Sequence, residues 1–85
     1  MNEELKYEIE LEEELKTAVN KGDVEWAKMV IAAYYHECIE LPDFVHLDEN
    51  DGSVIIEKKG GETFLRINRS EVMKYVKRRF GILNT

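Results

Sequence analysis

Two histidines and one cysteine carry the side chains best suited to metal binding or nucleophilic catalysis in this sequence. His36 and Cys38 lie two positions apart, and on a helix such neighbours point about 160° away from each other. They therefore cannot share a metal ion or act as a thiol and its base. His46 stands between Val45 and Leu47, so on a strand it faces away from the core. We predict that Cys38 is a small core residue, that the chain binds no metal or cofactor, and that it is not an enzyme.

An acidic run from Asp48 to Asp51, followed by Gly52, has the composition of a calcium-binding loop but not its spacing. An EF-hand loop has a glycine at its sixth position and ligands at its first and twelfth positions. Aligning Gly52 with that glycine puts Leu47 at the first ligand position and Lys58 at the last. Neither side chain suits calcium, so we interpret the run as a hairpin turn.

The two turns of the central segment fix one register for a three-stranded antiparallel meander between Phe44 and Asn68. Gly60-Gly61 is typical of a two-residue hairpin loop and would place Lys59 opposite Glu62. With the turn at 50–52, this register brings six apolar side chains to one face: Val45, Leu47, Val54, Ile56, Leu65 and Ile67. A slip of one residue would scatter them over both faces.

The same register gathers a second group on the outer face of the sheet, beside the charged Glu57. We predict that five of these residues bind a partner: Phe44, His46, Ile55, Phe64 and Arg66. Contiguous apolar patches larger than a few hundred Å² usually mark a contact surface. Two coverings of this face remain open, namely residues 1 to 20 of the same chain or a second chain.

Residues 3 to 20 are predicted to form the first helix. Apolar residues recur at helical spacing between 11 and 19, and Gly22 follows as a signal for the helix end. Between 3 and 11, however, apolar and charged residues alternate, which also fits a strand over 4 to 11 followed by a short helix. That alternative would add a fourth strand to the sheet.

A second helix is predicted to begin after Asp23, whose carboxylate can accept a hydrogen bond from the first turn. It continues to Leu41, because Pro42 prevents further extension. After the strands, the spacing of Asn68 and Glu71 resembles a capping box and starts the last helix. The predicted fold class is α+β: an N-terminal helical hairpin, a three-stranded antiparallel meander and a C-terminal helix, ααβββα.

Charge is distributed unevenly along the chain. Residues 1–50 carry fourteen acidic and four basic side chains, a balance of −10, and residues 51–85 carry four acidic and eight basic ones, a balance of +4. The basic excess includes a cluster near the end of the last helix: Lys74, Lys77, Arg78 and Arg79. Such a cluster could follow a phosphate backbone, which makes nucleic-acid binding the alternative function. The simpler interpretation is that the charges of the acidic and basic parts neutralise one another within the molecule or across a dimer.

Length and composition limit the remaining function classes. Eighty-five residues suffice for a single domain, residues 1–85. The longest apolar run is far shorter than a membrane span, and no secretory leader pattern precedes it. Together with the single cysteine, this predicts a cytoplasmic protein without membrane contact. We predict a small, acidic interaction or regulatory module without catalytic activity, whose partner is a second copy in a homodimer or another protein.

Overall fold

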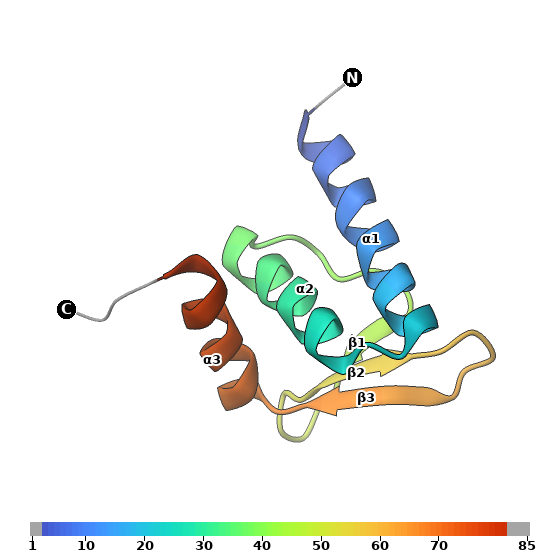
Figure 1. Cartoon of the computed structure of the whole chain (residues 1–85). Coiled ribbons are helices and arrows are strands. Elements are labelled where there is room, and N and C mark those ends of the chain that lie inside the picture. Colours follow the sequence, from blue (N-terminus) through green and yellow to red (C-terminus); the bar gives the residue numbers. More distant parts are fainter. Residues whose placement is uncertain (1–2, 82–85) are drawn as a thin grey trace.

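The computed structural model describes residues 3–81 and shows three helices and three strands (Figure 1). Their bounds in chain order are α1 Glu3–Lys21, α2 Val24–Glu37, β1 Val45–Leu47, β2 Val54–Glu57, β3 Thr63–Ile67 and α3 Arg69–Phe80. The order ααβββα confirms the predicted α+β fold. Within the described residues, no helix is both long and apolar enough to cross a bilayer.

The strands form an antiparallel sheet in the order β1-β2-β3. Val45 pairs with Ile56 across β1 and β2, and Ile56 pairs with Leu65 across β2 and β3, as the two turns predicted. The register shifts by one residue after Ile56, so the predicted pairing of Lys59 with Glu62 is wrong. The Lys58 amide instead donates to the Glu62 carbonyl at 2.7 Å. The loop between these two residues is therefore longer than a two-residue turn.

Helix α1 is continuous from Glu3, so the alternative strand over residues 4–11 is wrong. The chain reverses at Gly22, which has a φ of 71°. Asp23 then caps α2 as predicted, and its carboxylate accepts a hydrogen bond from the Trp26 amide at 3.0 Å. The Trp26 indole N–H donates to Glu14 of α1 at 2.8 Å, which joins the two helices of the hairpin.

Helix α2 ends at Glu37, four residues before the predicted end at Leu41. Cys38 adopts a left-handed backbone conformation with a φ of 57°. The Cys38 amide donates to the Tyr35 carbonyl at 3.3 Å, and the next amide donates to the Tyr34 carbonyl at 3.0 Å. This is the hydrogen-bond pattern of a Schellman motif. Because the helix stops there, Cys38 is exposed, and its predicted place in the core is wrong.

Replacing Cys38 by glycine should raise the free energy of unfolding by roughly 1 kcal/mol. The left-handed conformation costs an L-residue about 1–2 kcal/mol, and the greater freedom of glycine in the unfolded chain offsets part of the gain. Urea unfolding followed by circular dichroism measures the change. The matched control is Cys38→Ala, which removes the thiol but keeps the β-carbon. An equal gain in both variants would show that backbone strain at this position is not the cause.

All three helices lie on one side of the sheet, with α2 between α1 and α3 (Figure 1). Buried side chains from every helix and strand form one core cluster: Leu11, Leu15, Ala18, Val19, Ala27, Val30, Ile31, Ala32, Ala33, Tyr34, Val45, Val54, Ile56, Ile67, Val72, Tyr75 and Val76. The inward face of the sheet is therefore covered as predicted, with one exception. Leu47, the last residue of β1, is 49% exposed.

Helix α3 begins after Asn68, as predicted. The Asn68 side chain accepts a hydrogen bond from the Glu71 amide at 2.9 Å, and Gly81 ends the helix in the left-handed conformation. The Glu71 carboxylate does not return to the cap. It accepts a hydrogen bond from the Lys28 ammonium of α2 at 2.6 Å, and this bond raises the pKa of Lys28. A charged pair thus joins the acidic start of α3 to α2.

Candidate functional site

The outer face of the sheet brings three of the five predicted partner-binding residues into one row. His46 pairs with Ile55, and Ile55 pairs with Arg66, so the three side chains lie side by side on neighbouring strands. Within residues 3–81, no helix covers this face (Figure 1). Helix α1 instead packs against α2, where Leu11 and Leu15 are buried. The described part of the N-terminal segment is therefore not the cover of the outer face.

Phe44 and Phe64, the other two predicted residues, contribute less to this face than expected. Both are half-buried and pack against the core cluster. Phe44 precedes the first paired residue of β1, so the alternation of the strand does not fix its direction. Phe64 lies where the register between β2 and β3 shifts. Ile55 is consequently the apolar centre of the outer face, half-buried and outside the core cluster.

Charged side chains flank Ile55 on both sides. The Arg66 guanidinium donates to Asp48 at 2.6 Å and lies 3.3 Å from the Asp51 carboxylate. Its hydrogen bond lowers the pKa of Asp48. On the other side, the Nδ1 atom of His46 lies 3.7 Å from a Glu57 carboxylate oxygen. The outer face therefore presents an apolar centre, Ile55, flanked by the pair Arg66–Asp48 and the pair His46–Glu57.

The turn that carries Asp48 and Asp51 is held by its own hydrogen bonds. Each carboxylate accepts a bond from the backbone amide two residues later, at 2.7 Å for Asn50 and 2.9 Å for Ser53. The bond from Ser53 is the largest cause of the lowered pKa of Asp51. These local bonds show that Asp48 and Asp51 of the acidic run stabilise the turn. They also fix the carboxylates that Arg66 reaches from β3.

The cationic end of α3 is partly engaged with α2. Arg78 lies 3.4 Å from Glu25, and the Arg79 guanidinium donates to the Met29 carbonyl at 2.8 Å. Tyr75, a residue that could stack on a base, is buried and donates its hydroxyl proton to Glu25. Lys74, Lys77 and Arg78 of the predicted nucleic-acid surface are exposed, whereas Arg79 is half-buried. Two of the four predicted cations therefore act within the fold.

The histidine and cysteine positions do not converge. The His36 ring stacks on Phe80 of α3 with ring centroids 3.9 Å apart. His46 lies on the outer face of the sheet, whereas Cys38 lies at the end of α2. Across the part of the chain that the structure describes, no three His, Cys, Asp or Glu side chains are grouped to hold a metal ion.

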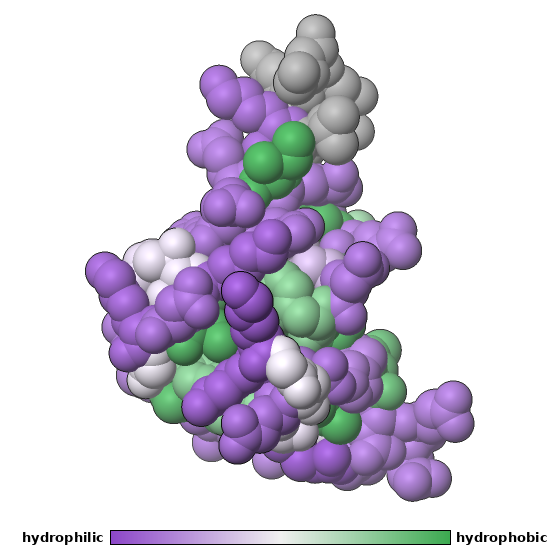
Figure 2. Space-filling view, turned by 90° about the vertical axis from the view of Figure 1, so that its right-hand side faces the viewer, coloured by the Kyte–Doolittle hydropathy of each residue, from purple (hydrophilic) through white to green (hydrophobic). Residues whose placement is uncertain are grey.

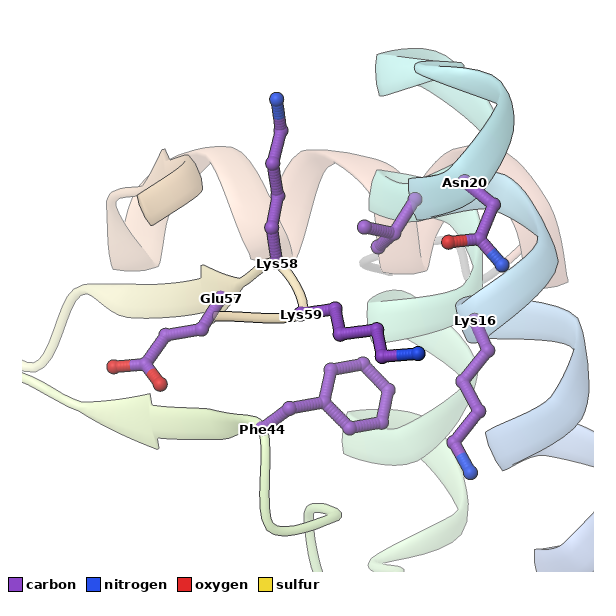
Figure 3. A pocket seen from close by; sticks show the side chains of 7 residues that line it. Lys16, Asn20, Phe44, Glu57, Lys58 and Lys59 are labelled. Carbon is purple, nitrogen blue, oxygen red and sulfur yellow. The ribbon is translucent and has the colours of Figure 1, made fainter. Parts of the chain in front are cut away.

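A crevice that the sequence did not indicate lies between the C-terminal half of α1 and the tip of the β2–β3 hairpin. It encloses about 280 Å³ and is lined by Lys16, Val19, Asn20, Phe44, Glu57, Lys58 and Lys59 (Figure 3). On this side of the molecule, hydrophobic side chains show in hollows between hydrophilic ones (Figure 2). The hydrophobic pattern did not indicate the crevice. The alternation of β1, extended back by one residue, assigns Phe44 to the outer face of the sheet, but Phe44 precedes the strand and lines the crevice.

The geometry thus offers two surfaces, the outer face centred on Ile55 and the crevice beside Phe44. Comparisons with protein-family models, with curated proteins and with solved structures found no match to this chain.

Proposed function

We propose that this chain is a non-catalytic interaction module that forms a homodimer through the outer face of its sheet. The observation that carries the proposal is the row His46, Ile55 and Arg66, an apolar centre between charged neighbours on a face without a covering helix. An antiparallel sheet can leave one face in water, but such a face is then usually polar along each strand. Ile55, at the centre of the middle strand, departs from that pattern.

The charges on this face suit a second copy of the same chain. Dimers with a two-fold axis bring identical patches together, so the patch must complement itself. With the axis running along β2, Ile55 meets its own copy, and the β3 side of one sheet faces the β1 side of the other. Arg66 of one protomer then faces His46 on β1 of its partner, and Asp48, which follows β1, lies on the same side of that sheet. Such complementarity guides the register of an interface more than it adds affinity.

The sharpest test is the variant Ile55→Glu, which places two carboxylates at the proposed two-fold axis. Ile55 lies outside the core cluster, so the variant should keep the circular dichroism spectrum and cooperative unfolding of the wild type. Phe64→Glu is a poorer test because Phe64 packs against the core. Sedimentation velocity in reducing buffer should show a wild-type dimer at concentrations up to about 1 mM and a monomeric variant.

The matched control is Met73→Glu, because Met73 is an apolar residue of α3 that is 43% exposed. It should leave the dimer intact. A wild-type chain that stays monomeric throughout would contradict the proposal, as would a dimer that Ile55→Glu leaves unchanged. Salt-sensitive retention of RNA or DNA in a gel-shift titration, lost in a Lys74→Gln and Lys77→Gln double variant, would favour the nucleic-acid alternative instead.

A further inference from the structure

The crevice between α1 and the β2–β3 tip has the features of a small ligand site. Its floor contains the half-buried ring of Phe44 and the buried side chain of Val19. Its volume of about 280 Å³ lies just below the range of ~300–1,000 Å³ that is usual for drug-sized ligands. A ligand that fits this space is therefore smaller than a typical drug and has an apolar body.

The rim of the crevice is cationic. In Figure 3, Lys59 runs past the Phe44 ring toward α1, and Lys16 borders the same space from the helix. The Asn20 side chain adds an amide donor from the next turn of α1. Glu57 also lines the crevice, but its carboxylate extends away from the ring and lies 3.7 Å from His46. Positive groups thus dominate the side of the crevice that faces α1.

We propose that this crevice binds a small amphipathic carboxylate, with its apolar body over Phe44 and its head group beside Lys59, Lys16 and Asn20. The lining contains no arginine, so single ammonium and amide donors would hold the carboxylate through charge-assisted hydrogen bonds. Lys16 already bonds Glu12 at 3.2 Å, which raises its pKa, so the head group competes with that exposed pair. Lys59 is the main contact for the head group.

Titration of isotopically labelled protein with octanoate tests the site by amide chemical shifts. For a ligand of this size at an open site, we expect a dissociation constant of about 1 mM, with the largest shifts at Val19, Phe44 and Lys59. Acetate lacks the apolar body and octylamine reverses the charge, so neither should shift these amides. The absence of octanoate shifts at about 10 mM, or equal shifts with octylamine, would overturn the proposal.

Two adjacent lysines provide a matched pair of variants. Lys59→Gln should weaken octanoate binding about threefold. Lys58 also borders the crevice, but its ammonium points away from the Phe44 ring in Figure 3, so Lys58→Gln should change binding less than about 1.5-fold. Phe44→Leu, which keeps an apolar residue against the core, should weaken binding and still fold. Equal effects of both lysine variants would show that general charge, not the crevice, attracts the ligand.

Two further titrations test whether the carboxylate belongs to a small molecule or to a chain terminus, and whether the site depends on the proposed dimer. A tetrapeptide ending in phenylalanine with a free C-terminus should bind more weakly than octanoate. If it binds more tightly at the same amides, the site takes a chain terminus and the small-molecule proposal is wrong. The Ile55→Glu variant should bind octanoate as the wild type does, because Ile55 does not line the crevice. Failure of the dimer proposal therefore leaves this one standing.

Discussion

The variant Ile56→Ala is expected to lose about 2–5 kcal/mol of its free energy of unfolding. Ile56 lies at the centre of β2, pairs with Val45 and Leu65, and is fully buried under the helices. Truncation removes apolar contact and leaves a cavity that the close-packed core cannot fill. A chain of this length has a total stability of roughly 4–13 kcal/mol, so the loss is a large fraction of it. Urea unfolding followed by far-ultraviolet circular dichroism measures it.

The neighbouring residue supplies the control. Ile55→Ala is the same chemical change one position earlier, on the outer face, and should cost about 1 kcal/mol or less because Ile55 is only half-buried in the single chain. The measurement belongs at low protein concentration, so that association does not add to stability. Equal losses in the two variants would contradict the assignment of adjacent isoleucines to opposite faces, and with it the register of the whole sheet.

Leu15→Ala is the second variant for which a loss of about 2–5 kcal/mol is expected. Leu15 is fully buried in the core cluster and belongs to the stripe that holds α1 against α2. The chain has one tryptophan, Trp26, and its indole bonds Glu14, the residue beside Leu15. A loosened α1 should therefore shift the fluorescence of Trp26 to longer wavelength. Urea unfolding and the emission spectrum of the native state give two independent readings.

Ile9→Ala is the control on the same helix. Ile9 is 51% exposed, so its truncation should change the free energy of unfolding by less than about 0.5 kcal/mol and leave the Trp26 emission unchanged. A loss at Ile9 as large as that at Leu15 would mean that α1 buries a different face. The two variants thus test the docking of α1 separately from the pairing of the strands.

The order of elements and the sheet register could be predicted because several local signals agree on them. The turn at 50–52 and the glycine pair place Val54 and Ile56 on the same face, and the structure pairs both with the expected partners. The side chains of Asp23 and Asn68 accept hydrogen bonds from free backbone amides in the first turn of a helix, so the starts of α2 and α3 could be predicted from the sequence. Agreement between turns, caps and periodicity is what a single stable fold requires.

The end of α2 could not be predicted, because its signal is a conformation and not a residue type. Cys38 adopts the left-handed region that glycine usually fills, while the apolar spacing continues to Leu41. The shift at the β2–β3 tip has a similar cause. Gly60 and Gly61 permit both a two-residue turn and the longer loop that the structure adopts, so the composition of the loop does not decide between them.

The candidate surfaces were predicted only in part. Strand alternation correctly placed His46, Ile55 and Arg66 together, since these lie within paired strands. The same rule failed for Phe44, which comes before the ladder begins and contacts the core instead. The crevice depends on where α1 ends relative to the hairpin tip. The position of α1 relative to the hairpin tip is set by how α1 and α2 pack on the sheet. Local sequence patterns do not predict this packing.

The exposed cap residue at the end of α2 has a practical consequence for the assembly. Cys38 is the sole thiol of the chain and directly follows α2. Helix α2 lies on the side of the sheet opposite its outer face (Figure 1). A nitroxide can therefore be attached to the native sequence without engineering. Dipolar spectroscopy on the labelled protein would give one spin–spin distance per dimer, long if the protomers meet sheet to sheet and short if they meet through their helices.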